Sequence, residues 1–596
     1  MMRETLAAAA MVALVACGVS DTASVDQSVT ADNAGTPGPN AAQEFAQLLD
    51  DHWALRMSEN PVLAEQLGDE SGRGKLSDPS LAAYEASAEA RQALLARLEA
   101  IDQSALAPDD ALNAQLLGVA LRNAVDAAQT NGRYLTITTY AAPHLSLARL
   151  AQQARLRKPE DVASYLGRLG GMRGYMEAVT ERLDEGVELG WVQPCSAMVG
   201  FERTFRTHIV DDPEQSVFFS PLKDNNVVSE SDRAEALRVI EGEIIPAFQA
   251  FETFYTDRYI ANCRDEVGIG SLQGGMEFYA LAAKQYTTTD MTPDEIHNVG
   301  LDEVARIRAE MTEVAAEAGF SELSAYQTHL RTNPEFYPAT AEERLARAST
   351  IAKRIDGQLV NLFTVLPRMP YDIRPIPLDV AEGTTTAYYS RPAPDGSRPG
   401  TYRLNTTRLA TRPLHELEAL TLHEAVPGHH LQIALAQELD LPNFRRFGSV
   451  TAYTEGWGLY SERLGLEVGF YQTPETNFGR LSYEMWRACR LVVDTGMHAK
   501  GWTRQEAIDF MLANTGLSAN NIEREVDRYI TWPGQALAYK IGELKIRELR
   551  ARAEEALGRD FDVRRFHDVV LANGPVPLSV LDTIVSAWIE SKQAGE

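Results

Sequence analysis

The stretch "LHEAVPGHHLQ", Leu422–Gln432, begins with a His-Glu pair that is typical of metal-binding helices and then departs from the usual pattern. In His-Glu-x-x-His, two histidines four residues apart lie on one face of a helix and bind one metal ion, while the glutamate acts as general base. Position 427, where the second histidine would stand, is a proline. If this stretch binds a metal, a later histidine must therefore face His423.

Pro427 decides which histidine can do so. On a regular helix, His429 would lie about 120° around the axis from His423, and His430 would lie about 10 Å along it. Zinc needs ligand nitrogens about 2 Å from the ion, so neither pairing works on a regular helix. Pro427 cannot donate to the carbonyl of His423 and therefore interrupts that helix. A two-residue bulge at Pro427-Gly428 predicts His429 as the second ligand, with His430 as the alternative.

The carboxyl group of Glu424 is expected to point toward the interior. Leu417, Leu420 and Glu424 follow one another at i, i+3 and i+7 of a helix predicted to begin near Pro413, so all three share its apolar face. A carboxylate without a partner is costly in that position. We therefore expect Glu424 to lie beside a metal or a substrate and to act as the general base.

The third metal ligand is expected from a second helix, "AYTEGWGLYSERLG", Ala452–Gly465. Glu455 lies far enough after His429 for one helix and a loop to intervene. Two histidines, one glutamate and an open position are the coordination of catalytic rather than structural zinc. The sequence therefore predicts one Zn²⁺ ion held by His423, His429 and Glu455.

Three neighbours of Glu455 are also informative. Gly456 and Gly458 permit the close approach of another backbone. Glu462 is either a partner that holds a ligand imidazole in place or a plain surface carboxylate.

Residues 370–408 differ from the helical sequence on either side. Runs of Thr, Tyr and Val, punctuated by Pro, Asp-Gly and Pro-Gly, predict two or three short antiparallel strands joined by turns. An exposed strand edge could pair with a substrate backbone, with Tyr388 and Tyr389 as substrate-binding residues. The alternative is a structural hairpin that packs on helices.

The N-terminus resembles an export signal. In residues 1–17, Arg3 and Glu4 offset each other in charge, and a short apolar run and then Cys17 follow. The apolar run is too short to span a bilayer. "LVAC" matches a lipobox, in which Cys17 is lipidated and anchors the protein to a membrane; an ordinary secretory signal is the alternative. Residues 18–43 are rich in small and polar side chains and are predicted to form a flexible tether.

The rest of the chain is predicted to be helical and globular. Residues 44–270 form an N-terminal helical region and residues 271–596 a catalytic region. Of the 596 residues, 44% are hydrophobic and 23% charged, and the net charge of −28 argues against nucleic acid as a partner. Cys195 and Cys263 are a candidate disulfide in an oxidising compartment, although these two and Cys489 could equally be buried free thiols.

Four segments together carry a resemblance to a known family: "HEAVPGHHLQ", "AYTEGWGLYSE", "SRPAPDGSRPGTYRLN" and "YITWPGQALAYKIG". They resemble the bacterial proteins of domain of unknown function family 885, many of them described as lipoproteins, over nearly all of the mature chain. More distantly, "HE" before "GHHL" and the later "TEGWG" are similar to helical zinc peptidases such as angiotensin-converting enzyme, the oligopeptidases and the thermostable carboxypeptidases.

The more distant resemblance implies a fold and further site residues. It implies a mostly α-helical, two-lobed body with a small antiparallel sheet beside a deep cleft. It also implies an oxyanion donor from a late helix, for which Tyr539 is our first choice and His498 and Tyr529 are the other candidates; each could instead pack between helices. Arg487 and Arg490 could bind a substrate carboxylate, or form structural ion pairs.

The resulting prediction is a zinc-dependent metallopeptidase that hydrolyses short peptides. Gly18 after Cys17 implies, by the same resemblance, a lipid anchor on the periplasmic face of the outer membrane. The alternatives are a non-catalytic helical binding or scaffold lipoprotein, and a zinc hydrolase of another amide or ester. The sequence indicates no oligomeric state.

Overall fold

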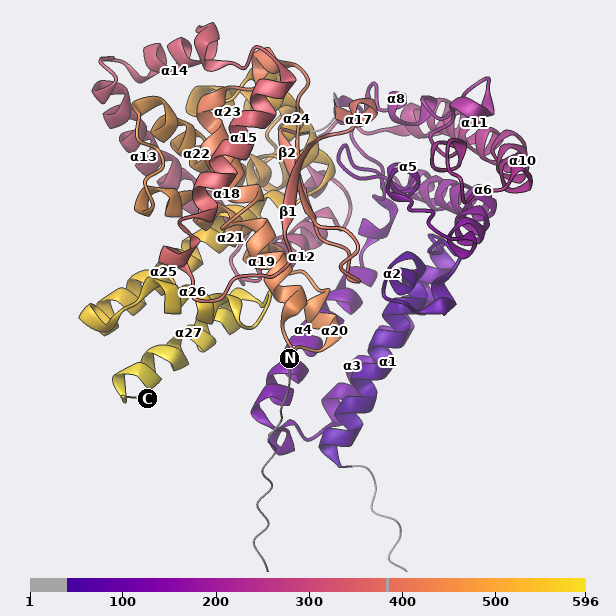
Figure 1. Cartoon of the computed structure of the whole chain (residues 1–596), viewed down its shortest axis with the longest axis horizontal. Coiled ribbons are helices and arrows are strands. Elements are labelled where there is room, and N and C mark those ends of the chain that lie inside the picture. Colours follow the sequence, from indigo (N-terminus) through magenta and orange to yellow (C-terminus); the bar gives the residue numbers. More distant parts are fainter. Residues whose placement is uncertain (1–39, 382–384, 596) are drawn as a thin grey trace, which may run out of the picture. The chain divides into compact units, whose positions relative to one another are not determined.

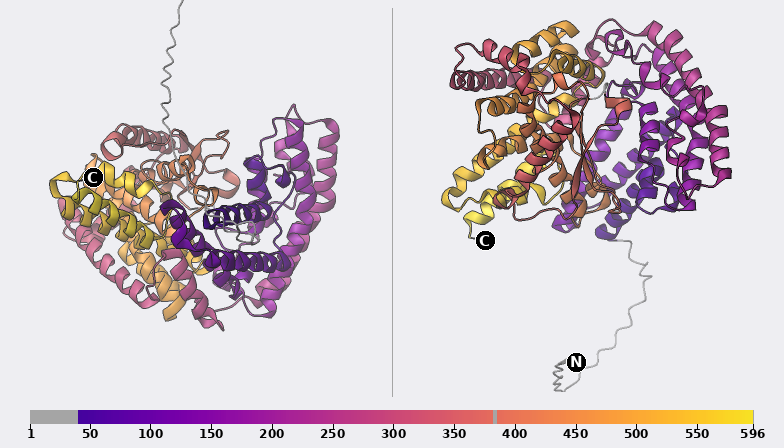
Figure 2. Two further views of the ribbon diagram at one scale, coloured as in Figure 1. Left: turned by 90° about the horizontal axis from the view of Figure 1, so that it is seen from below. Right: turned by 45° about the horizontal axis from the view of Figure 1, so that its top comes forward.

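The protein is mostly helical in the computed structural model, which describes residues 40–381 and 385–595 (Figure 1, Figure 2). The predicted signal segment, the lipobox residue Cys17 and nearly all of the predicted tether, residues 18–43, lie outside the described residues. Within the described part, no helix is long and apolar enough to cross a membrane.

The helices before residue 260 are α1 (Ala41–Glu59), α2 (Pro61–Gln66), α3 (Leu81–Ala100), α4 (Pro108–Ala128), α5 (Pro143–Gln153), α6 (Pro159–Glu188), α7 (Cys195–Met198), α8 (Arg203–Arg206), α9 (Ser220–Lys223), α10 (Glu230–Val239) and α11 (Ile245–Phe254). The later helices are α12 (Gly275–Thr287), α13 (Pro293–Glu317), α14 (Leu323–Thr332), α15 (Ala341–Asp356), α16 (Leu359–Leu362), α17 (Leu378–Ala381), α18 (Leu417–Glu424), α19 (His429–Glu438), α20 (Asn443–Arg446), α21 (Thr451–Leu464), α22 (Pro474–Lys500), α23 (Arg504–Asn514), α24 (Ala519–Thr531), α25 (Ala538–Leu557), α26 (Val563–Leu571) and α27 (Leu578–Gln593).

Several of these helices begin at caps that the local sequence supplies. The Ser80 hydroxyl accepts from the Ala83 N–H at the start of α3. At the start of α13, Thr292 and Glu295 form a capping box, with Pro293 in the first turn. Such caps satisfy backbone N–H groups that the first turn of a helix leaves without an internal partner. Helix boundaries of this kind are a local property of the sequence.

A large cluster of buried apolar side chains joins the two regions predicted from the sequence. It includes Leu116 and Leu169 before residue 270, and Trp457 and Ile589 after it. Residues Ala41–Glu596 accordingly form one compact unit. Cys195 and Cys263 are joined by a disulfide, as the sequence suggested, and Cys489 is a buried free thiol.

The small sheet is mixed rather than antiparallel, which corrects the prediction. Its strands are β1 (Tyr371–Pro375), β2 (Ala387–Ser390) and β3 (Gly400–Leu404), in the order β1-β3-β2. β2 pairs antiparallel with β3, whereas β1 pairs with β3 in parallel. Because the chain passes through α17 before it enters β2, β1 reaches the far side of β3 instead of forming a hairpin. The sheet lies beside α18 and α19 (Figure 1).

Two glycines let α21 and α25 pack against each other closely. A Cβ added at Gly542 would lie 1.9 Å from the Ala452 carbonyl oxygen, and one at Gly456 would lie 2.5 Å from the Gly542 Cα. Any side chain at these positions would therefore force the helices apart. The close approach predicted at Gly456 is confirmed.

A buried lysine fixes the start of α25 to two other helices. The Lys540 ammonium is fully buried and lies 2.8 Å from Glu303 of α13, 3.0 Å from Glu484 of α22 and 3.0 Å from Glu543 of α25. A buried ammonium is tolerated only when carboxylates neutralise it in this way. Tyr539, the residue before it, is therefore held in a defined place.

Candidate metal centre

The motif helix breaks at Pro427. α18 ends at Glu424, α19 begins at His429, and the connecting residues include a cis peptide bond between Val426 and Pro427. The sequence predicted a two-residue bulge within one helix, whereas the structure has two helices with a short connection. The Trp457 Nε1–H of α21 donates to the Pro427 carbonyl oxygen at 2.9 Å and holds this connection in place.

Gly428 lets the chain turn back on itself at this break. A Cβ there would lie 2.0 Å from the His423 carbonyl oxygen, so no other residue fits without movement of the backbone. As a result, His429 at the start of α19 faces His423 at the end of α18. Their ring centroids are 4.6 Å apart, with an angle of 83° between the ring planes.

Glu455 of α21 completes a group of three possible ligands. Its Oε2 lies 3.4 Å from His429 Nε2 and 3.7 Å from His423 Nε2, and the ligand atoms of all three residues lie within 4.8 Å of one another. Glu455 Oε2 has no hydrogen-bond partner among the described residues, and both distances exceed an ordinary N–H···O bond of about 2.7–3.2 Å. Ligands at about 2.0–2.2 Å from a tetrahedral zinc ion are separated by about 3.4 Å. The three side chains, called the ligand group below, therefore fit this metal.

The structure separates the two candidate histidines of α19. His430 turns away from Glu455: its Nδ1 accepts from the Tyr389 hydroxyl at 2.9 Å, and its Nε2 donates to the Met369 carbonyl oxygen at 2.9 Å. Burial lowers the pKa of His430 to about 4. Of the two alternatives, His429 is the histidine that faces His423.

Both sheet tyrosines predicted to bind substrate are partly buried on β2. Tyr389 uses its hydroxyl to hold His430, as described above. Tyr388, its neighbour, lies opposite Arg403 of β3 in the antiparallel register. The Tyr389 ring also lies beside the ligand residue His429, with 6.5 Å between the ring centroids. Substrate binding by either tyrosine stays a prediction.

Glu462 orients His423, the first candidate ligand. Its Oε1 accepts from His423 Nδ1 at 2.8 Å and forms an ion pair with Arg487 Nη2 at 3.0 Å, and the residue is only 1% exposed. The alternative of a surface carboxylate is therefore wrong. Arg487 forms the structural ion pair that was the alternative to substrate binding. With Nδ1 protonated, the lone pair of His423 is on Nε2, which faces Glu455. A Cβ at Gly458 would lie 2.7 Å from His423 Cε1, so this glycine makes room for the imidazole.

The imidazole of His423 lies in a strongly negative environment. Burial lowers its pKa, but the nearby carboxylates of Glu455 and Glu462 outweigh burial and raise the pKa to about 9. A bound cation would relieve the excess of negative charge at this point.

Replacing Glu462 by glutamine should weaken zinc binding by about 10- to 100-fold, the usual cost of losing a hydrogen-bond partner of a metal-binding histidine. The variant keeps the shape of the side chain but removes the charge that orients His423 and pairs with Arg487. Competition with a chromophoric chelator measures the affinity. Glu523→Gln, an exposed change on α24, is the matched control; equal affinities in the two variants would contradict the assigned role.

Glu424 lies at the end of α18, next to His423. The residue is 7% exposed, and its Oε2 has no hydrogen-bond partner within the described parts of the chain. Burial raises the pKa of its carboxyl group. A buried carboxylate with an unused oxygen beside the ligand group can accept a proton from water, as the sequence predicted for a general base.

Tyr539 contacts the ligand group directly. Its ring stacks on that of His423, with 6.4 Å between centroids and 18° between planes. The Tyr539 hydroxyl accepts from Arg528 Nη2 at 3.3 Å, which leaves its own O–H to donate. Of the three oxyanion candidates, Tyr539 is the one that the structure brings to the site.

His498 is not part of this site. It is buried in α22, where Nδ1 accepts from the Ile269 N–H at 3.1 Å and Nε2 donates to the Tyr529 carbonyl oxygen at 2.9 Å. Burial lowers the pKa of His498 to about 3, so the ring is neutral. Because both ring nitrogens bond to the main chain, the prediction that His498 is catalytic is wrong.

Tyr529 and Arg490 hold each other instead of a substrate. The Tyr529 hydroxyl accepts from Trp486 Nε1 and from Arg490 Nε, both at 2.8 Å, and donates to Glu525 Oε2 at 2.9 Å. Arg490 Nη2 also lies 2.9 Å from Glu525. These contacts saturate the Tyr529 hydroxyl, so its predicted role in oxyanion or substrate binding is wrong. Arg490 forms a buried ion pair with Glu525, which was the alternative to substrate binding.

Two residues near the site were missed by the sequence prediction. Arg528 of α24 lies next to Tyr539, and its guanidinium is 4.8 Å from the ring of Tyr140. Tyr140 belongs to a loop between α4 and α5, which is docked on α24 where the Thr139 N–H donates to the Thr531 hydroxyl. Arg528 directly precedes "YITWPGQ", part of a segment that carries the family resemblance, and that position could have pointed to it. The sequence around Tyr140 contains no motif that would single this tyrosine out.

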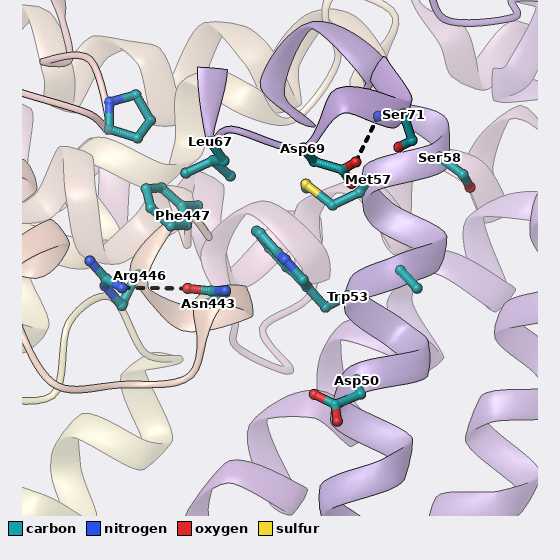
Figure 3. A pocket seen from close by; sticks show the side chains of 12 residues that line it. Asp50, Trp53, Met57, Ser58, Leu67, Asp69, Ser71, Asn443, Arg446 and Phe447 are labelled. Carbon is teal, nitrogen blue, oxygen red and sulfur yellow. Dashed lines mark hydrogen bonds between the residues drawn. The ribbon is translucent and has the colours of Figure 1, made fainter. Parts of the chain in front are cut away.

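A cavity of about 590 Å³ lies elsewhere in the molecule (Figure 3). It is lined by Trp53 and Met57 of α1, by Arg446 of α20 and by Phe447, among others. None of the predicted site residues lines it, so the ligand group, and not this cavity, carries the recognisable chemistry.

Comparison with solved structures shows two similar folds. A crystal structure of "the putative lipoprotein from Colwellia psychrerythraea" is 29% identical, has a TM-score of 0.84, and matches 93% of this chain and 100% of its own. "A putative lipoprotein of unknown function from Shewanella oneidensis" is 19% identical, has a TM-score of 0.69, and matches 92% of this chain and 100% of its own. At that identity, the second likeness shows a shared fold only.

No curated protein matches the sequence. A family model matches residues 61–585, which cover all of the site residues described above. The resemblance carried by four sequence segments is thereby confirmed, and the chain belongs to the family described as "Bacterial protein of unknown function (DUF885)".

Proposed function

We propose that this protein is a zinc-dependent hydrolase that cleaves peptide bonds in short peptides. The observation that supports this most is the group of His423, His429 and Glu455, whose facing atoms are spaced as the ligands of one tetrahedral zinc ion. Glu424 lies beside the group and is not needed as a ligand. Three protein ligands and a separate carboxylate are the arrangement of a catalytic rather than a structural site.

Each residue of the site would have a distinct part in hydrolysis. A bound zinc ion would supply a Lewis acid and lower the pKa of bound water from 15.7 to about 7. Glu424 would accept a proton from the attacking water and deliver it to the leaving nitrogen. Tyr539 would donate its O–H to the developing oxyanion. Glu462 and Arg487 would keep His423 in its orientation.

The proposal includes an exported, lipid-anchored protein. The sequence "LVAC" provides Cys17 as the anchored residue, and two proteins of similar fold are described as putative lipoproteins. We place the enzyme on the periplasmic face of the outer membrane, where a two-lobed body with a deep cleft would admit peptides and exclude folded proteins.

Metal removal tests this proposal. The purified protein should contain about one zinc ion per chain and should cleave members of a random peptide library. Treatment with a chelator should abolish cleavage and lower the melting temperature, since a metal that binds only the folded state stabilises it. Adding zinc should restore both. A protein that binds no metal would match a scaffold lipoprotein, and one that binds zinc but cuts no peptide would not be a peptidase.

A further inference from the structure

Among the described residues, Arg528 shares its one carboxylate partner, Glu525, with Arg490. Glu525 lies between two arginines, but it pairs with Arg490 at 2.9 Å and leaves Arg528 Nη1 at 3.7 Å. The Tyr529 hydroxyl also donates to Glu525 Oε2, the oxygen that faces Arg490. Within residues 40–381 and 385–595, no other carboxylate forms an ion pair with Arg528. Two buried guanidinium groups that share one carboxylate leave an excess of positive charge, which favours a further anion.

The guanidinium of Arg528 is held in place for binding. Nη2 donates to Gln535 Oε1 at 2.8 Å and to the Tyr539 hydroxyl at 3.3 Å, while the rings of Tyr140 and Trp532 lie 4.8 and 5.8 Å from the guanidinium carbon. The residue is 9% exposed, and its Nε has no described hydrogen-bond partner. Arginine held between aromatic rings, with a donor that has no partner, suits a carboxylate.

Tyr539 connects Arg528 to the proposed metal ligands. The hydroxyl of Tyr539 contacts Arg528, while the ring of the same tyrosine stacks on His423. A carboxylate bound by Arg528 would therefore lie within a short stretch of peptide chain from the ligand group, since an extended chain spans about 3.3–3.6 Å per residue.

We infer that Arg528, flanked by Tyr140 and Tyr539, binds the free α-carboxylate at the C-terminal end of a peptide substrate. The enzyme would then release short fragments from the C-terminus. The inference rests on the proposed function and adds its substrate class: peptides with a free C-terminal carboxylate, cut near that end. Hydrolysis itself is unchanged, with water added across the peptide bond to give one new carboxylate and one new amine.

Matched peptides test the inference. A peptide that the zinc-loaded wild type cleaves is synthesised with a C-terminal carboxylate and with a C-terminal amide. We expect kcat/KM to be about 10- to 100-fold higher for the acid, the usual value of hydrogen bonds to a charged group. In Arg528→Gln the ratio of acid to amide should fall to near one. Misfolding would lower both rates together and would not change this ratio.

Two further variants sharpen the result. Arg528→Lys keeps the charge but loses the paired donors, so its ratio should lie between those of the wild type and Arg528→Gln. Arg524→Gln, an exposed change one turn earlier on α24, should keep the wild-type ratio. Equal cleavage of acid and amide by the wild type overturns this inference alone. Failure of the zinc-loaded wild type to cut any peptide overturns the proposed function and, with it, the inference.

Discussion

Peptide hydrolysis should fall by about 10²- to 10⁴-fold when Glu424 is replaced by glutamine, with zinc still bound. Glutamine keeps the size of the side chain but cannot accept a proton from water. Glu424 Oε2 has no described hydrogen-bond partner, so the exchange breaks no contact of this oxygen. The loss should therefore appear in kcat, with little change in stability. Steady-state kinetics on a cleaved peptide, with zinc content measured on the same sample, checks this.

The matched control for this variant is Glu418→Gln. Glu418 lies on the same helix, but it accepts from the Tyr471 N–H and pairs with Arg354, away from the ligand group. Its replacement should leave the rate nearly unchanged. If Glu424→Gln retained more than a tenth of the wild-type rate, Glu424 would not be the general base.

Loss of zinc is the expected result of Glu455→Ala. The change removes one of the three protein ligands, so zinc affinity should fall by more than the 10- to 100-fold that a hydrogen-bond partner such as Glu462 contributes. The stabilisation of the folded state by added zinc should disappear with it. Chelator competition and thermal melts with and without zinc measure both effects.

Glu467→Ala serves as the control for the loss of a carboxylate nearby. Glu467 follows α21 on the surface, where it pairs with Arg550, and exposed pairs of this kind contribute about 0–1 kcal/mol. Its variant should bind zinc as the wild type does. Wild-type affinity in Glu455→Ala would rule out the proposed ligand set.

The prediction of the ligand group depended on local chemistry. A proline cannot donate a backbone hydrogen bond, so a helix break between His423 and His429 followed from the sequence. The need for a third ligand then pointed to Glu455 on a later helix. The exact form of the break was not predictable, because it depends on Trp457 of another helix, which bonds to the Pro427 carbonyl oxygen.

The direction of β1 was not predictable for a related reason. Alternation and turn residues indicate where strands lie, but they do not specify which strand pairs with which. The parallel pairing of β1 with β3 joins segments about 30 residues apart, which a local pattern does not specify. Similarly, the metal-site residues belong to helices of the C-terminal region, yet Tyr140 comes from a loop of the N-terminal region.

By itself, the sequence determined the helical class, the break at Pro427 and the residues able to bind a metal, because these depend on backbone chemistry and short-range spacing. Only the tertiary structure decided the partners of the polar residues in the later helices. Arg487, Arg490 and His498 look alike in sequence as candidates, and each is neutralised or saturated by a neighbour distant in the chain. Arg528 differs because the carboxylate nearest to it is already held by another arginine. Burial and pairing depend on which helices meet, and that information is not local.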